Sequence, residues 1–190
     1  MKKVHFIGIG GIGISAIARF LKERDFIISG SDIADSAITK ELRASGMKIT
    51  VPHCKTAIED PDFVVYSAAI KGDNVELLEA RKRGIECLSR KEALPFILEG
   101  KRVFAVAGAH GKSTTSAMLA SLMEGSAIIG AISKEFGSNM KYEASDNLIF
   151  EADESDSSFL NSNPFLAIVT NAEPEHMEHY DNDIEKFHAA

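Results

Sequence analysis

Short runs of hydrophobic residues alternate with longer amphipathic segments along most of this 190-residue chain. Several of the runs are rich in β-branched residues and apolar on both sides, which is typical of strands in a parallel sheet covered on both faces. The predicted strands are residues 4–9, 26–29, 48–51, 63–67, 85–88, 103–107, 127–132, 148–151 and 166–170. Strands that alternate with helices predict a doubly wound α/β architecture.

The segments between the runs carry helical patterns. Four apolar residues after the first run have the spacing of one helix face: Ile14, Ile17, Ala18 and Leu21. Val75 and Leu78 begin another apolar stripe, which ends at Gly84. We therefore expect Val75 and Leu78 to face the core.

A third helix is predicted after residue 89. Ser89 and Glu92 have the spacing of a capping box, in which each side chain bonds to the backbone of the other residue. Pro95 lies inside the segment that follows, so we expect a kinked or short helix over residues 90–98.

The order of elements restarts after residues 98–102, a polar stretch that contains a glycine. We therefore expect one domain over residues 1–99 and a second over 100–190. A helical pattern over residues 183–190 begins with acids and meets no terminating Gly, Asn or Pro. The second domain also has four predicted strands against five in the first, so we expect the chain to be a fragment of a longer protein.

Composition indicates a globular domain, with 45% hydrophobic and 26% charged residues. The net charge of −7 argues against a general nucleic-acid-binding surface. No apolar stretch approaches the ~18 residues of a membrane span, and glycines interrupt the N-terminal region where a signal peptide would need an apolar core. Cys54 and Cys87 have no CxxC spacing, which favours free thiols in a reducing compartment. We expect a cytoplasmic protein.

A first glycine-rich loop, GIGGIG at residues 8–13, matches G-x-G-x-x-G between a predicted strand and a predicted helix. Glycines there allow a tight turn, and the helix N-terminus attracts a diphosphate. Asp32 follows Gly13 by 19 residues, where a dinucleotide enzyme has the acid that binds the ribose. The pattern indicates a nucleotide diphosphate without identifying it, and a simple packing turn is the alternative.

A second loop, GAHGKST at residues 108–114, follows another predicted strand. Its ending is typical of a phosphate loop, whose amides hold phosphates while Lys112 reaches the β- and γ-phosphates and the Ser113 hydroxyl binds Mg²⁺. The first glycine of the usual motif would fall at Val106, so the loop is shorter than usual. A chance Gly-Lys-Ser is the alternative.

Two polar clusters follow the last two predicted strands. Residues 151–156 contain four acids, which suits the carboxylate that completes a magnesium shell, although a solvated acidic turn is the alternative. Residues 170–179 include His176 and His179 among acids. A metal ligand and a surface histidine both remain open for His176, and zinc is disfavoured because no third ligand has a familiar spacing.

These motifs together resemble those of the Mur ligases. The resemblance rests on the shortened G-x-x-G-K-[ST] loop, on EADESDSSF at 151–159 and on TNAEPEHM at 170–177. The GIGGIGIS start, the SAAI segment at 67–70 and the LSR segment at 88–90 are also similar. The family fold implies a Rossmann-like UDP-sugar-binding domain with a parallel sheet, an incomplete P-loop-type α/β ATPase domain, and a C-terminal amino-acid-binding domain that is absent here.

The resemblance also implies site residues. Those that would hold the UDP sugar are Gly10, Gly11, Asp32, Ile33, His53, Ser67, Ala68, Ala69, Ile70 and Asn74. Those that would hold ATP are Gly108, Ala109, His110, Gly111, Lys112, Ser113, Thr114 and Asn171. Lys112, Glu151 and His176 would be catalytic, and Ser113, Glu151 and His176 would bind Mg²⁺ directly or through water. The sequence departs from the family at Ala109, Ser113, Glu175 and Glu178, where Thr, Thr, Asp and Asp are common.

The motifs are most similar to those of family members that join L-alanine to UDP-N-acetylmuramate through an acyl phosphate. We expect ATP and Mg²⁺ as cofactors, no nucleic-acid or membrane partner, and no peptide-bond formation by this fragment alone. A Mur-type ligase that recycles murein peptides is the nearest alternative. An NAD-dependent oxidoreductase would leave the second loop unexplained, and a P-loop regulatory module would leave the first unexplained. The oligomeric state stays open.

Overall fold

The computed structural model describes residues 1–152, 158–174, 177, 181 and 183–189. The chain forms two compact units, Met1–Ala93 and Leu94–Ala190, and the boundary falls within helix α4 (Arg90–Ile97). The boundary expected between a sugar-binding domain at 1–99 and an ATP-binding domain at 100–190 lies a little after this structural boundary, and it stays a prediction. His176 and the acids at 153–156 are outside the described residues.

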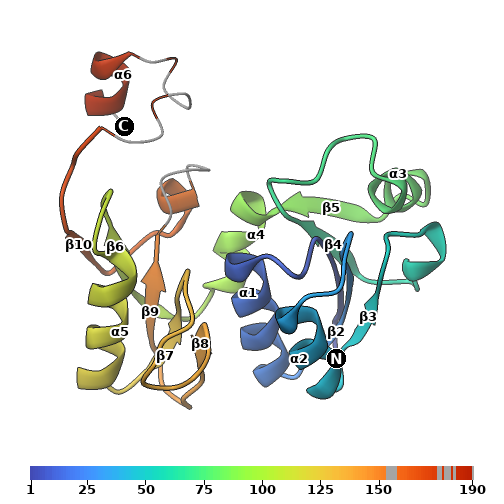
Figure 1. Cartoon of the computed structure of the whole chain (residues 1–190), viewed down its shortest axis with the longest axis horizontal. Helices are drawn as coiled ribbons and strands as arrows, with labels where there is room; N and C mark the ends of the chain where they lie inside the picture. The colour runs from blue at the N-terminus through green and yellow to red at the C-terminus, as the bar shows by residue number, and fades with distance from the viewer. Residues whose placement is uncertain (153–157, 175–176, 178–180, 182, 190) are drawn as a thin grey trace. The chain divides into compact units, whose positions relative to one another are not determined.

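The first unit contains a five-stranded parallel sheet with the order β3-β2-β1-β4-β5 (Figure 1). Its strands are β1 (Lys3–Ile7), β2 (Ile27–Ser31), β3 (Lys48–Thr50), β4 (Phe63–Tyr66) and β5 (Glu86–Ser89). The other elements are α1 (Ile12–Glu23), α2 (Ala37–Ala44), the 3₁₀ turn η1 (Lys55–Ala57) and α3 (Val75–Lys82). The chain order reverses beside β1, so the carboxyl ends of β1 and β4 form the crevice where such sheets bind ligands.

The predicted stripe on α1 is confirmed, because Ile14, Ile17, Ala18 and Leu21 are all buried. The stripe predicted on α3 is wrong. Val75 and Leu78 are exposed by 39% and 50%, whereas Leu77 and Ala80 are buried and pack with Ile7, Ile58 and Val64. The helix has only eight residues, so two apolar positions did not define its inner face. That face also contains Glu76, a fully buried carboxylate whose partners come from distant strands.

The second unit contains a mixed sheet with the order β10-β6-β9-β7-β8. Its strands are β6 (Arg102–Ala107), β7 (Ser126–Ile128), β8 (Met140–Lys141), β9 (Asn147–Glu151) and β10 (Leu166–Val169). Its other elements are α5 (Lys112–Leu122), the 3₁₀ turn η2 (Ser158–Asn161) and α6 (Ile184–Ala189). The antiparallel β8 was not predicted, because two residues are too few to show a period. Helix α5 packs against β6, β7 and β9.

The capping box before α4 is confirmed. The Glu92 carboxylate accepts from the Ser89 backbone at 2.8 Å, and the Ser89 hydroxyl accepts from the Glu92 backbone at 3.3 Å. Pro95 lies within α4, which is short, as expected.

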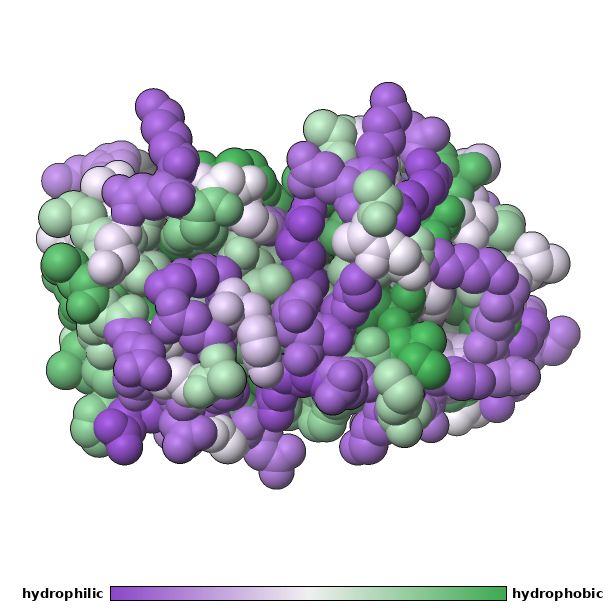
Figure 2. Space-filling view, turned by 90° about the horizontal axis from the view of Figure 1, so that it is seen from below, coloured by the Kyte–Doolittle hydropathy of each residue, from purple (hydrophilic) through white to green (hydrophobic). Residues whose placement is uncertain are grey.

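The exposed surface mixes polar and apolar residues. On the face in Figure 2, hydrophilic residues are interrupted by small hydrophobic patches, as on ordinary globular proteins. No helix within the described part of the chain is long and apolar enough to cross a membrane. Cys54 and Cys87 are free thiols, and both are partly buried.

Candidate nucleotide sites

A pocket of about 410 Å³ lies at the carboxyl ends of the strands in the first unit. It is lined by Gly8, Gly10, Gly11, Asp32, Ile33, Ala34, Asp35, Ser36, His53, Ser67, Ala69 and Ile70. Eight of the ten residues predicted for the UDP sugar are among them. Sequence reasoning missed four lining residues, although the segment between Asp32 and Ser36 could have been included because it continues from the end of β2.

Two predicted residues, Ala68 and Asn74, are not part of this lining. Ala68 is exposed between two lining residues. Asn74 caps helix α3, because its side-chain oxygen accepts from the amides of Glu76 at 2.9 Å and Leu77 at 3.2 Å. An N-cap residue satisfies amides that the helix cannot. The structure therefore gives Asn74 a folding role.

Asp32 lies directly against the first glycine loop. One of its carboxylate oxygens accepts from the Gly10 amide at 2.8 Å, and the other accepts from the Ile33 amide at 2.8 Å. A Cβ at position 10 would come within 2.8 Å of the Asp32 carboxylate. The contact brings a negative charge to the amide of Gly10, one of the residues expected to hold the UDP sugar.

The neighbouring amides of the loop also have partners within the protein. Gly8 and Ile9 both donate to the Ser31 carbonyl at 2.9 Å, and Gly11 donates to the Gly8 carbonyl at 3.2 Å. An anion that binds these amides must therefore replace existing hydrogen bonds.

The second glycine loop packs against the end of β10. Gly108 has φ of +124°, and a Cβ there would collide with the Thr170 hydroxyl and lie 2.8 Å from the Asn171 carbonyl. Gly111 has φ of +82° and precedes the first residue of α5. Both positions therefore require glycine.

Asn171, predicted at the ATP site, holds this loop from the side. Its amide oxygen accepts from the His110 backbone at 3.1 Å, and its amide nitrogen donates to the His110 carbonyl at 2.9 Å. The Lys112 ammonium lies over the loop and donates to the carbonyls of Gly108 at 2.7 Å and Ala109 at 3.2 Å. The loop thus carries its own cation.

Ser113 and Glu151 meet beside the second loop. The Ser113 hydroxyl donates to Glu151 Oε1 at 2.9 Å, and the Gly130 amide donates to Glu151 Oε2 at 2.9 Å. Adjacent oxygens in an octahedral Mg²⁺ shell with ~2.1 Å bonds lie about 3 Å apart. The hydroxyl and carboxylate therefore suit Mg²⁺ in both spacing and chemistry. Among the described residues, no three His, Cys, Asp or Glu side chains gather as a complete metal site.

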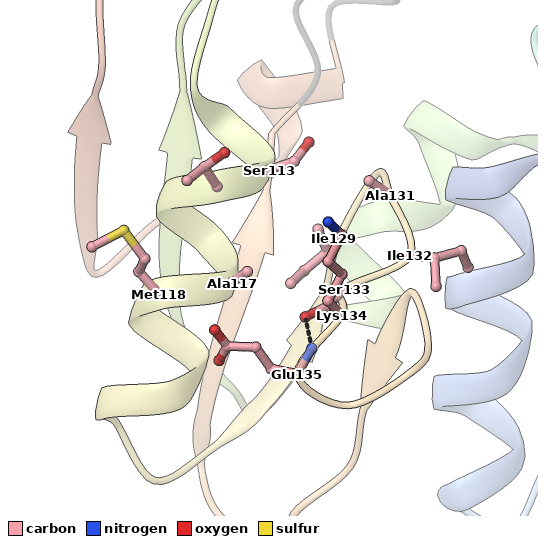
Figure 3. A pocket seen from close by; sticks show the side chains of 10 residues that line it. Ser113, Ala117, Met118, Ile129, Ala131, Ile132, Ser133, Lys134 and Glu135 are labelled. Carbon is pink, nitrogen blue, oxygen red and sulfur yellow. Dashed lines mark hydrogen bonds between the residues drawn. The ribbon is translucent and has the colours of Figure 1, made fainter.

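A cavity of about 320 Å³ lies next to this pair (Figure 3). Ser113, Thr114, Ala117 and Met118 of α5 form one wall, and residues 129 and 131–135 form the other. The Glu135 amide donates to the Ser133 hydroxyl at 3.2 Å, which orders the second wall. Sequence reasoning missed this wall, although a loop that follows a strand beside the phosphate loop could have indicated it.

Two glycine loops, each between a parallel strand and a helix, are typical of nucleotide-binding α/β proteins. The model of the Mur ligase family, catalytic domain, matches residues 3–102. The chain belongs to the Mur ligase family.

Similar proteins agree with this membership. The chain is 77% identical over 190 residues to the UDP-N-acetylmuramate–L-alanine ligase of Campylobacter curvus, covering all of this chain and 44% of that protein. It is 58% identical over 186 residues to the ligase of the same name from Helicobacter pylori, covering 97% of this chain and 41% of that protein. The chain thus spans less than half the length of these curated relatives.

Solved structures of the family have the same fold. The UDP-N-acetylmuramate-alanine ligase of Thermotoga maritima is similar with a TM-score of 0.93 and 33% identity, covering 100% of this chain and 46% of that one. A second similar structure is the UDP-N-acetylmuramate:L-alanyl-γ-D-glutamyl-meso-diaminopimelate ligase of Neisseria meningitidis. It has a TM-score of 0.87 and 25% identity, covering 98% of this chain and 67% of that one.

Proposed function

We propose that the intact protein is an ATP-dependent ligase that joins L-alanine to the carboxylate of UDP-N-acetylmuramate during cytoplasmic synthesis of peptidoglycan precursors. The observation that carries this proposal is the pair of glycine loops in separate units. Only the second loop contains a lysine, Lys112, and has the Ser113–Glu151 pair beside it. The names of the similar proteins from Campylobacter and Helicobacter support the choice of substrates.

In this proposal, the pocket of the first unit binds the UDP sugar. Its volume of about 410 Å³ suits part of a nucleotide. The segment Ser67–Ile70 after β4 and the loop after β1 lie on the two sides of the point where the strand order reverses. Ligands of open α/β sheets bind at this point.

The second unit binds ATP. Lys112 would exchange its two carbonyl partners for phosphate oxygens, which are stronger acceptors for an ammonium. Ser113 and Glu151 would hold Mg²⁺, which neutralises charge on the phosphates when it is bound. His176 remains a proposed further ligand and lies outside the described residues.

The reaction that follows has two steps. The substrate carboxylate attacks the γ-phosphorus of ATP and forms an acyl phosphate, with ADP as the leaving group. The amine of L-alanine then attacks the acyl carbon and expels phosphate. The first step requires stabilisation of phosphate charge more than covalent help, and Lys112 can supply it.

The test is product analysis by mass spectrometry. The intact protein is incubated with UDP-N-acetylmuramate, ATP and Mg²⁺, and with either L-alanine or the tripeptide L-alanyl-γ-D-glutamyl-meso-diaminopimelate. We expect ADP and UDP-N-acetylmuramoyl-L-alanine. If product formed only in the incubation with the tripeptide, the result would instead favour peptide recycling. The similarity to the Neisseria structure keeps that activity as the alternative. Thermal stabilisation by NAD(H) and not by the UDP sugar would favour an oxidoreductase.

A further inference from the structure

Lys134 has no partner among the described residues, unlike every other lysine and arginine of the second unit. The others bind a carbonyl, a carboxylate or an aromatic ring, and they are Lys101, Arg102, Lys112, Lys141 and Lys186. Lys134 is exposed and lies in the loop between β7 and β8. An ammonium has three donors and no acceptor, so Lys134 can bind an anion without giving up an existing contact.

The side chain of Lys134 lines the cavity of about 320 Å³ beside the second glycine loop. In Figure 3 it runs past Ile129, and its nitrogen points toward the end of the cavity where Ser113 lies. Glu135 is the one acid in this lining, and its carboxylate accepts from the Ser121 hydroxyl further along α5. The cavity therefore has a positive group at the end next to the phosphate loop.

The backbone that carries Lys134 is held in place by hydrogen bonds. The Ile129 amide donates to the Asn139 carbonyl at 2.9 Å and closes the loop. The next amide, that of Gly130, donates at 2.9 Å to Glu151, the carboxylate of the proposed Mg²⁺ site. The loop is thus fixed to the same carboxylate that meets the phosphate loop. A donor on an ordered backbone loses less entropy when it binds its ligand.

The rest of the cavity is mostly apolar. Besides Lys134, Glu135 and three hydroxyl side chains, its lining consists of Ala117, Met118, Ile129, Ala131 and Ile132. Phosphate oxygens that faced these side chains would lose hydrogen bonds to water and gain none. A carboxylate on a short aliphatic group fits better, because its oxygens can meet the ammonium while its carbons contact the apolar wall.

The proposed reaction needs a carboxylate at this place. The first step joins a carboxylate oxygen to the γ-phosphorus of ATP, and the two reacting atoms must come within roughly 3–3.5 Å of each other. The γ-phosphate is assigned to Lys112 and to the Mg²⁺ held by Ser113 and Glu151. The site of the carboxylate must therefore border the phosphate loop, as this cavity does.

We propose that Lys134 determines specificity for UDP sugars that carry a carboxylate: its ammonium binds the carboxylate of the acyl substrate in this cavity, with the short aliphatic group against Ala117, Ile129 and Ala131. The inference rests on the proposed function for the identity of the substrate. A sugar without the carboxylate gains nothing from Lys134.

The role of Lys134 in the first step is to position the nucleophile. As the carboxylate oxygen bonds to the γ-phosphorus, the bond from that phosphorus to the ADP oxygen breaks, and ADP leaves with the electron pair. Lys134 keeps its protons throughout, because the step transfers none. Loss of the ammonium should therefore weaken binding and orientation of the carboxylate and leave the binding of ATP unchanged.

The test compares two ligands that differ by the carboxylate. UDP-N-acetylglucosamine lacks the lactyl group that carries the carboxylate of UDP-N-acetylmuramate. Calorimetry of the intact protein without ATP should show that the wild type binds UDP-N-acetylmuramate on the order of 10-fold more tightly, the scale of one charge-assisted hydrogen bond. Equal affinities in the wild type would overturn the proposal, and this measurement needs no variant.

Three variants then assign the preference to the ammonium. Lys134→Met should bind both UDP sugars equally, with the affinity of the wild type for UDP-N-acetylglucosamine, whereas Lys134→Arg should keep a preference for the carboxylate. Exposed Lys186, paired with Asp181 on the surface, provides the matched control Lys186→Met, which should behave as wild type. A merely structural defect would weaken both sugars together.

Steady-state kinetics complete the test. Lys134→Met should lower kcat/KM for UDP-N-acetylmuramate by ~10–100-fold, with an unchanged KM for ATP. If Lys134→Met weakened ATP binding and retained the preference between the sugars, Lys134 would serve the phosphate and the proposal would be wrong. An active wild type combined with a Lys134→Met variant that keeps the preference would overturn this inference alone. If the intact wild type formed no product from UDP-N-acetylmuramate, the proposed function itself would fail, and the role of Lys134 with it.

Discussion

The two glycine loops have the same local architecture but opposite charge. The first loop receives a carboxylate, because Asp32 accepts from the Gly10 amide. The second loop receives an ammonium, because Lys112 donates to the Gly108 and Ala109 carbonyls. A phosphate that enters the second loop finds a cation in place, whereas one that enters the first meets the Asp32 carboxylate at the Gly10 amide.

The loops also differ in how tightly their glycines are enclosed. Gly108 combines a positive φ with close contacts to the end of β10. At Gly11, no positive φ is required, and a Cβ would approach an Ile14 methyl group at 3.3 Å. A strand–glycine–helix pattern therefore predicts the turn but does not reveal which ligand the turn can hold.

Removal of the cation from the second loop should have the largest effect. Lys112→Ala in the intact protein should lower turnover by ~10²–10³-fold, the scale for loss of one preorganised electrostatic group. Affinity for UDP-N-acetylmuramate should change less than about twofold, because that pocket belongs to the other unit. Steady-state kinetics and calorimetry measure the two quantities, and near-normal turnover would rule out the phosphate-loop role of Lys112.

Replacement of one glycine in each loop by alanine should lower the free energy of unfolding by different amounts. Gly108→Ala should lower the free energy of unfolding by about 2–4 kcal/mol, from left-handed strain and overpacking together. Gly11→Ala should cost less than about 1 kcal/mol, because its neighbour is a side-chain methyl group. Urea unfolding of the 190-residue chain measures both, and equal costs would contradict the described difference in packing.

Loss of charge beside the second loop should alter its metal requirement. Glu151→Gln retains the size of the side chain but not its charge, so half-maximal turnover should require on the order of 10-fold more Mg²⁺. Glu124 is an exposed glutamate of the same unit, and Glu124→Gln serves as the control. A Mg²⁺ titration in which the two variants agree would remove Glu151 from the proposed metal site.

Acid should weaken the first unit through Glu76. Because the folded-state pKa of Glu76 is below its ordinary value of 4.5, its contribution to stability is present above that pH and is lost as the pH falls through the folded-state pKa. At pH 7, the free energy of unfolding of the wild type should exceed that of Glu76→Gln by about 1 kcal/mol. Urea unfolding at pH 3 to 7 should show this gap narrowing below pH 4.5, and a gap that widens in acid would mean that Glu76 is buried neutral.

The sequence predicted what depends on local pattern. The nine strands, the Ser89–Glu92 cap and both glycine loops follow from short-range spacing and turn chemistry, and all appear in the fold. Eight of the predicted sugar-site residues line one pocket because the carboxyl ends of parallel strands meet at one edge of the sheet.

What the sequence did not predict depends on contacts between distant residues. His5 and Glu76 are 71 positions apart, so nothing near Glu76 indicated that a carboxylate would occupy the inner face of α3. The contact between Asp32 and Gly10 likewise depends on how β1 and β2 pair. The spacing of Asp32 suggested a ribose contact, whereas its two oxygens bind backbone amides.

The central claim is that the two loops bind different nucleotides, and amide chemical-shift mapping of the 190-residue chain tests it most directly. UDP-N-acetylmuramate should shift amides at residues 8–11, 32–36, 53 and 67–70, while ATP with Mg²⁺ should shift those at 108–114, 151 and 171. Neither ligand should shift the amides assigned to the other. Shifts by the UDP sugar at 108–114, or by ATP at 8–11, would contradict the assignment of one nucleotide to each loop.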